Sequence, residues 1–177
     1  ERDVFARLLY GFRIAMTLSL GYRFLTYLIA MAAGSLMGFF GGKTDMLGLR
    51  LVEIWANVPF LYMVIILVSV MPGWWGVGWQ VSSLLFIMVL FSWTGMTYYI
   101  RAAVYKEKAR DYVSAAKVIG AGPLRIIFRH LLPNVISTLV TFAPFTIAAA
   151  ISSITALDFL VYVLPPPTPR WGGLLKQ

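Results

Sequence analysis

Four long apolar stretches, separated by short polar connections, dominate the pattern of the sequence. They lie at residues 13–40, 47–71, 81–105 and 133–157. Each is long enough to cross the hydrocarbon core of a bilayer, which takes about 20 helical residues. A bilayer core cannot satisfy free backbone groups, and a barrel would need shorter, alternating segments. The pattern therefore predicts an all-α, polytopic transmembrane helical bundle with four crossings.

The first twelve residues, ERDVFARLLYGF, show a different pattern. Val4 and Leu8, together with Phe5 and Phe12, fall on one side at helical spacing, and the charges fall on the other. Such a segment is typical of an amphipathic helix at a membrane surface. We expect it to lie along the outer interface before the chain turns into the first crossing.

The composition excludes most soluble and catalytic classes. The chain is 60% hydrophobic and 12% charged, against about 45–50% and about 25% in an ordinary soluble domain. It contains no cysteine, one histidine and seven carboxylates. Disulfides and thiolate metal sites are therefore excluded, and little remains for acid–base chemistry.

The charges predict the orientation in the membrane. The connection between the third and fourth crossings, within residues 101–130, carries nearly half of the 15 lysines and arginines, whereas the tryptophan loop, MPGWWGVGWQ at residues 71–80, carries none. By the positive-inside rule the basic connection is cytoplasmic, and so is the GGKTD turn around Lys43. The tryptophan loop then faces outward, and Trp74, Trp75 and Trp79 suit an interfacial aromatic belt.

Two patterns inside the crossings suggest packing and bending. Ala30, Gly34 and Gly38 recur every four residues, a spacing that lets another helix approach closely. Pro59, preceded by Asn57, predicts a kink in the second crossing, which either lines a translocation path or is only structural.

Arg23 lies about 14 Å inside the first crossing by helical rise, where a charge costs at least about 2.5 kcal/mol. It needs a partner or a wet cavity, and Glu53 lies too close to the cytoplasmic end to serve. A role in a translocation path, snorkelling and pairing with a second subunit all remain open.

The basic connection predicts a compact helical hairpin. Asp111 is expected to cap the start of a short helix, and Gly120 to end it in a left-handed conformation. Gly122 and Pro123 are expected to start a second helix, and Pro133 to mark re-entry into the membrane. A rigid cytoplasmic element tethered to two crossings could pass force to a membrane pore.

Two further signals do not support catalysis. GGKT at residues 41–44 lacks the preceding glycine of a phosphate-binding loop, because Met37 occupies that position, and it follows a membrane helix. His130 has no second ligand for a metal and no nucleophile for a triad. We expect it to cap the end of the second cytoplasmic helix.

Residues 114–134, SAAKVIGAGPLRIIFRHLLPN, resemble the cytoplasmic signature of ABC importer permeases. There, a glutamate-alanine-alanine triplet, a glycine and a distal apolar-proline pair form the coupling helix that docks on an ATPase. Ser114 stands at the glutamate position, so Asp111 or Glu107 would have to supply any charged contact. The resemblance implies an ATPase-coupling role for Asp111, Tyr112, Ser114, Ala115, Ala116, Gly120, Arg125, His130, Pro133 and Asn134.

The resemblance extends over nearly the whole chain. It includes RDVFARLLYGFRIAMTLSL, GFFGGKTDMLGLRLVEIWANVPFL and LDFLVYVLPPPTPRWGGLL, and it is to the permeases of dipeptide, oligopeptide and nickel importers, above all those for oligopeptide and peptide-antibiotic uptake. Val161 and Val163 stand where glycines are common in that family, and Arg170 where serine is. The resemblance implies a periplasmic segment at residues 158–177, with docking residues Asp158, Trp171 and Gly172. Family members have six crossings and this chain starts with Glu1, so we expect truncation at both ends.

The resemblance implies a type I ABC importer permease subunit in the bacterial inner membrane. Its partners would be a second homologous permease, two ATPases that bind ATP and magnesium, and a periplasmic or extracellular solute-binding protein. The chain itself would be no enzyme, would bind no cofactor or nucleic acid, and would form part of the path for peptides or peptide-like solutes, with Arg23, Asn57 and Pro59 as path candidates.

Three other functions stay open from the residues alone. A secondary transporter driven by an ion gradient would need ionisable groups near the midplane, of which only Arg23 qualifies. A permease for another small solute, such as a nickel chelate, shares the same motifs. An anchoring subunit would have no path of its own.

Overall fold

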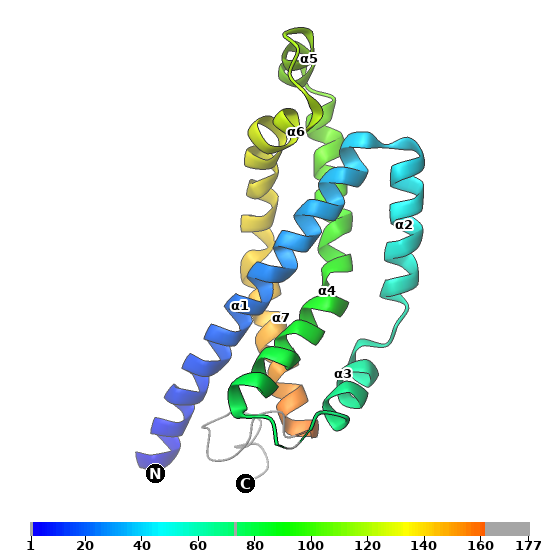
Figure 1. The fold of residues 1–177 in the computed structure, drawn as a ribbon. Coiled ribbons are helices and arrows are strands. Elements are labelled where there is room, and N and C mark those ends of the chain that lie inside the picture. The colour runs from blue at the N-terminus through cyan, green and yellow to red at the C-terminus, as the bar shows by residue number, and fades with distance from the viewer. Residues whose placement is uncertain (1, 73, 162–177) are drawn as a thin grey trace. The chain divides into compact units, whose positions relative to one another are not determined.

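The computed structural model describes residues 2–72 and 74–161, and every element within these ranges is helical (Figure 1). This confirms the all-α prediction. The helices are α1 (Arg2–Phe40), α2 (Gly42–Ala56), α3 (Phe60–Ser69), α4 (Val77–Lys108), α5 (Asp111–Val118), α6 (Pro123–Ile126), the π-helical segment η1 (Ile127–Leu131) and α7 (Leu132–Val161).

Three stretches of the described chain are long and apolar enough to cross a membrane. They are Leu8–Phe40, Gly78–Lys108 and Pro123–Leu157. Helices α2 and α3 pass the same test only when taken together, so the count rises to four if they form one broken span. Three of the four predicted crossings lie within these longer apolar helices, and most of the other, 47–71, lies on α2 and α3.

Helix α1 corrects the expectation for the first twelve residues. It runs as one α-helix of 39 residues, so residues 2–12 continue directly into the first span (Figure 1). The chain does not turn between a surface helix and the crossing. The amphipathic pattern lacks a helix stop signal at its end, since Gly11 and Phe12 carry no proline or polar cap after them.

The second span is broken at Pro59 instead of kinked. Helix α2 ends at Ala56, and Pro59 is the N-cap of α3 with φ −66° and ψ 103°. Proline disfavours the helical conformation of the residue before it, here Val58, so the helix stops. The side-chain amide of Asn57 donates a hydrogen bond of 2.8 Å to the carbonyl of Glu53, which satisfies one of the free acceptors at the end of α2.

The fourth span starts ten residues earlier than expected. Helix α6, η1 and α7 follow each other without a break, so Pro133 lies in the first turn of α7 and marks no separate entry. In an ordinary α-helix the ring of Pro133 would clash with the carbonyl of Arg129. The wider turn of η1, where the amide of Leu132 donates to the carbonyl of Ile127, relieves this conflict. His130 therefore lies inside a continuous helix, and its predicted capping role is wrong.

The chain divides into two compact units, which we describe separately. The hairpin unit comprises residues 26–57 and 92–144. Its apolar core runs through the second halves of α1 and α4, the α5–α6 hairpin and the start of α7. The buried members are Ala30, Phe39, Met96, Ile100, Val104, Val113, Ala116, Ile126, Ile127, Leu131, Val135 and Leu139.

The loop unit comprises residues 1–25, 58–91 and 145–177 and includes the tryptophan loop. Its core is built from α1, α3, α4 and α7. The buried members are Tyr22, Val64, Leu84, Ile87, Met88, Val89, Ala150, Ile154 and Leu157. Each unit thus has a core of its own.

Within the hairpin unit, the small residues of α1 pack directly on α4. A Cβ atom added at Gly34 would lie 2.8 Å from the Cβ of Ile100, and one at Gly38 would lie 2.8 Å from the Cβ of Val104. Ala30, one turn earlier, is fully buried. The four-residue repeat therefore lies at a close helix–helix contact.

Candidate functional site

The N-cap of α5, the first helix of the hairpin, lies one residue before the predicted N-cap. Arg110 is the N-cap, with φ −81° and ψ 152°, and no side chain caps the amides. Its carbonyl accepts a hydrogen bond of 3.1 Å from the amide of Val113, which sets the helix start. The prediction that Asp111 is the cap is wrong. Asp111 is instead the first helical residue, where its carboxylate interacts favourably with the helix dipole.

The end of α5 follows the expected geometry. Gly120 has φ +83°, in the left-handed region. Its amide donates to the carbonyl of Lys117 at 3.0 Å, and the amide of Ala121 donates to the carbonyl of Ala116 at 3.0 Å. These two hydrogen bonds form a Schellman motif. Gly122 then caps α6, and Pro123 occupies its first turn, as expected.

The hairpin has an inward apolar face and an exposed face. Val113, Ala116 and Ile126 are buried in the core of the hairpin unit. Ser114 and Ala115 are exposed. At the end of α5, Val118 and Ile119 are 87% and 84% exposed, although both are apolar. Exposed apolar side chains outside the spans are typical of a protein contact surface.

Tyr112 ties the hairpin to both flanking helices. Its hydroxyl donates a hydrogen bond of 2.8 Å to Oε2 of Glu107, at the end of α4. It accepts one of 3.2 Å from Nδ2 of Asn134, at the start of α7. The same amide group donates to the carbonyl of His130 at 2.8 Å. The Tyr112 hydroxyl of α5 is thus hydrogen-bonded to both α4 and α7.

The environment of Tyr112 also perturbs its ionisation. Burial raises the pKa of the Tyr112 hydroxyl, and the hydrogen bond that it donates to Glu107 raises this pKa further. Glu107 is engaged as well by Arg110, at 3.1 Å between Oε1 and Nε. Two carboxylates were predicted as possible contacts with an ATPase. Glu107 already interacts with Tyr112 and Arg110 of this chain, whereas Asp111 is exposed.

Asp45 and Arg101 form the most buried charge pair in the described part of the hairpin unit, and neither residue was predicted to be part of a site. Asp45, in the first turn of α2, is only 8% exposed. Arg101 on α4 donates hydrogen bonds from Nε and a terminal nitrogen to its two oxygens. Tyr105, one turn further along α4, donates a third at 3.0 Å. A planar guanidinium facing a carboxylate in this way is a bidentate, strongly directional contact.

A signal for this pair was present in the sequence. Asp45 follows the glycine turn by three residues, and Arg101 lies four residues before the end of the third apolar stretch, so both stand near the ends of crossings that are predicted to be cytoplasmic. The lysines and arginines of this region were used only to predict the orientation of the chain in the membrane. A carboxylate in such a basic region indicates a paired charge, because an unpaired one would be costly to bury.

The three residues predicted to line a translocation path, Arg23, Asn57 and Pro59, belong to two different units. The Cζ of Arg23, in the loop unit, lies 4.7 Å from the centre of the Tyr22 ring, and its buried Nε has no hydrogen-bond partner among the described residues. Asn57 and Pro59 are both exposed at the break between α2 and α3. Glu53 forms an exposed ion pair of 2.8 Å with Arg50.

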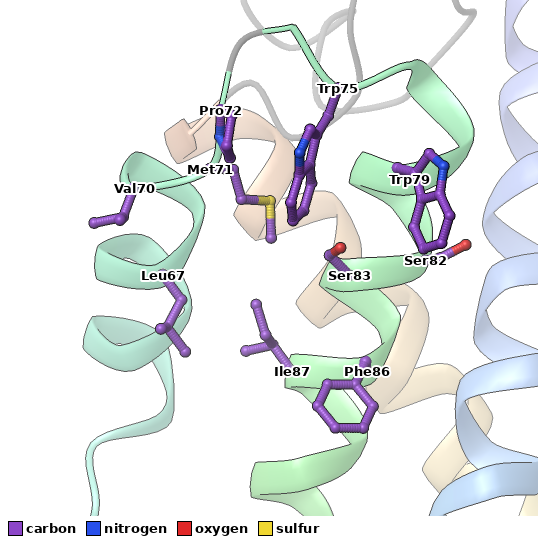
Figure 2. A pocket seen from close by; sticks show the side chains of 10 residues that line it. All are labelled: Leu67, Val70, Met71, Pro72, Trp75, Trp79, Ser82, Ser83, Phe86 and Ile87. Atoms are coloured by element: carbon purple, nitrogen blue, oxygen red, sulfur yellow. The ribbon is translucent and has the colours of Figure 1, made fainter.

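A cavity of about 510 Å³ lies in the loop unit between α3 and α4, beside the tryptophan loop. Figure 2 shows Trp75 and Trp79 at its wall near the loop, with Leu67 and Ile87 further along the helices. All of its lining residues are uncharged. Trp74 is 84% exposed. The cavity thus offers apolar surface and two serine hydroxyls but no ionisable group.

The other predicted residues divide as follows. Arg125 is exposed on α6 and His130 is half-buried in η1. Asp158 belongs to α7, and Trp171 and Gly172 lie outside the described residues. Across the part of the chain that the structure describes, no group of three histidine, cysteine or carboxylate side chains could hold a metal.

The geometry defines a polytopic helical membrane protein with an exposed helical hairpin tied to two spans. Residues 30–177 match the family described as the inner membrane component of binding-protein-dependent transport systems. The chain belongs to this family, and it is therefore a multi-pass protein of the bacterial inner membrane. The family consists of transport components, as expected for a chain that is not itself an enzyme.

Individual relatives agree with this assignment. The chain is 40% identical to the peptidoglycan transport system permease protein YejE of Agrobacterium fabrum and 39% identical to the inner membrane ABC transporter permease protein YejE of Escherichia coli. It is 32% identical to the oligopeptide transport system permease protein OppC of Bacillus subtilis. The matches cover 99% of this chain and 45%, 50% and 56% of these relatives, respectively. The chain thus spans about half the length of the curated relatives it matches.

Proposed function

We propose that this chain is part of the permease of an ATP-driven importer for peptides or peptide-like solutes. The names of the relatives support this solute class and give no support to an ion-gradient transporter or an anchoring subunit. The chain makes and breaks no covalent bond. ATP and magnesium are held by two partner ATPases, and a second permease and a solute-binding protein complete the transporter.

In this proposal an ATPase binds the α5–α6 hairpin and displaces it. The observation that carries it is the double attachment of Tyr112, which bonds to Glu107 on α4 and to Asn134 on α7. Closure of the ATPases moves the hairpin, and α4 and α7 move with it. Such rigid-body movement of helices alternates the access of a central path.

The exposed end of α5 is the proposed contact with the ATPase. Val118 and Ile119 present apolar surface to the solvent. Ser114 and Ala115 extend the exposed surface along α5. Because the inward face is already packed, the contact does not require the hairpin to unfold.

The binding protein docks, in this proposal, on the segment from Asp158 to Gln177, which includes Trp171 and Gly172. The path candidates Arg23, Asn57 and Pro59 keep their proposed role near the solute. Arg23 is supported by its buried Nε–H, which has no hydrogen-bond acceptor among the described residues and is therefore an unused donor for an oxygen atom of the solute.

The test is copurification of the transporter in mild detergent. Val118→Lys and Ile119→Lys leave α5 intact, because a cation is favourable at a helix end, but they place charge in the apolar contact. We expect the ATPase to be lost while the second permease is retained. The control Trp74→Ser alters an equally exposed residue of the tryptophan loop and should retain the ATPase. Full retention in both lysine variants, with unchanged uptake, would contradict the proposal.

A further inference from the structure

Asp45 and Arg101 join α2 to α4 at the end of the hairpin unit that carries α5. The carboxylate of Asp45 is buried and accepts hydrogen bonds from Arg101 and Tyr105. The two donors lie four residues apart, so they project from the same face of α4. Three directed hydrogen bonds fix the first turn of α2 in position and in rotation.

The chain on the other side of the α1–α2 turn is fixed to the same helix. The ammonium group of Lys108 donates to the carbonyl of Phe39 at the end of α1. Gly41 and Gly42, between the two attachments, have φ +65° and +51°. Without the attachments these glycines would leave the turn free to flex, because glycine adopts many conformations at little cost.

The apolar core continues from this turn into the hairpin. Phe39 of α1 and Val104 of α4 belong to the same buried cluster as Val113 and Ala116 of α5. The α1–α2 turn, the end of α4 and the hairpin are thus in continuous contact within the hairpin unit. Tightly packed contacts of this kind transmit displacement instead of absorbing it.

We propose that Asp45 and Arg101 are positioning residues that couple the movement of the hairpin to α2. This inference rests on the proposed function, in which an ATPase displaces the hairpin. The pair makes the α1–α2 turn move with α4 and α5 as one body. The displacement then reaches α2, which ends at the break that contains Asn57 and Pro59. If the pair is broken, the two glycines take up the movement and α2 no longer follows.

The first test measures coupling in the complete transporter, reconstituted in proteoliposomes. Asp45→Asn should lower solute uptake per ATP hydrolysed about tenfold, with hydrolysis itself little changed. The matched control Glu53→Gln removes a carboxylate from the same helix, whose ion pair with Arg50 is exposed, and should leave uptake per ATP unchanged. Lower uptake and hydrolysis in equal proportion would show a structural role only and would overturn the proposal.

Two milder variants test the same coupling in case Asp45→Asn does not fold. Tyr105→Phe removes one hydrogen bond and keeps the ion pair, and Arg101→Lys keeps the charge and loses the bidentate geometry. We expect uptake per ATP to fall in both, more in Arg101→Lys. Normal coupling in these two variants would overturn the proposal.

A distance measurement tests the same point directly. Spin labels at Lys43→Cys in the turn and Leu124→Cys on α6 of the hairpin both occupy exposed positions outside the proposed ATPase contact. In the otherwise unchanged protein the distance between the labels should be the same with and without ATP, and Arg101→Lys should make it depend on ATP. A distance that already changes with ATP in the unchanged protein would refute the single moving body. Absence of ATP-driven uptake in the unchanged transporter would instead refute the proposed function.

Discussion

Gly38 of α1 lies so close to Val104 of α4 that no side chain fits between them. An added Cβ would lie 2.8 Å from both Cβ and Cγ1 of Val104 and 2.9 Å from the carbonyl oxygen of Arg101. The backbone oxygen cannot rotate away as a flexible side chain could. This close approach also brings the α1–α2 turn within reach of the polar side chains on α4.

Gly38→Ala should therefore destabilise the protein. We expect a loss of about 1–3 kcal/mol, because the two helices must separate to admit one methyl group. Gly95→Ala on α4 is the matched control, since its Cβ would meet nothing within 4 Å, and helix propensity predicts a gain of about 0.5–1 kcal/mol there. Thermal unfolding in detergent measures both. Equal stability of the two variants would show that α1 and α4 do not pack at Gly38.

Gly120 tests the end of α5. Its φ of +83° is strained for any residue with a side chain, although a Cβ atom added there would meet no other atom within 4 Å. Gly120→Val should cost about 1–2 kcal/mol through strain alone, and Gly120→Asn should cost less, because asparagine tolerates the left-handed region. Gly122→Ser, two residues on with φ −69°, should be neutral. ATPase retention and solute uptake should fall in the order Ser, Asn, Val, and any other order would contradict the Schellman geometry.

Tyr112→Phe removes the hydroxyl that connects α5 to α4 and α7. The loss should be about 0.5–1.5 kcal/mol, since Glu107 and Asn134 each lose one hydrogen bond but keep a second partner, Arg110 and the carbonyl of His130 respectively. Hydrogen exchange of the α5 amides should accelerate accordingly, whereas Tyr62→Phe, at an exposed position on α3, should not change it. Unchanged exchange in Tyr112→Phe would mean that the hydroxyl does not hold the hairpin.

The raised pKa of Tyr112 predicts a pH dependence. Its neutral form is favoured in the folded protein by burial and by the hydrogen bond to Glu107. This contribution to stability is therefore fully present below the ordinary tyrosine pKa of about 10, and it is lost as the pH rises through the higher pKa of the folded state. A titration by NMR with ring-labelled tyrosine, in which Tyr112→Phe identifies the signal, should show Tyr112 ionising at a higher pH than free tyrosine. Earlier ionisation would contradict the burial.

The features that the sequence revealed were local ones. The apolar stretches predicted the spans, and the spacing of Gly120, Gly122 and Pro123 predicted the hairpin, because capping depends on a few neighbouring residues. The repeat of Ala30, Gly34 and Gly38 likewise needs only one helix to be recognised. Each of these signals lies within one turn or one helical face.

The features that the sequence did not reveal depend on contacts between distant segments. Asp45 and Arg101 are 56 residues apart, and neither residue alone indicates its partner. The N-cap of α5 lies at Arg110, one residue from the predicted cap, and the π-helical turn before Pro133 differs from an α-helical turn by one hydrogen bond. Side-chain preferences do not resolve differences this small. The break at Pro59 was expected as a kink, because the local rule for proline does not separate the two outcomes.

The central claim is that the α5–α6 hairpin lies in the cytoplasm, where an ATPase can reach it. The chain contains no cysteine, so single cysteines at Val118 and Trp74 can be labelled with a membrane-impermeant maleimide in sealed vesicles of known orientation from which the ATPases have been removed. We predict that Val118→Cys reacts only in inside-out vesicles and Trp74→Cys only in right-side-out vesicles. Reaction of Val118→Cys from the outer face would contradict the account.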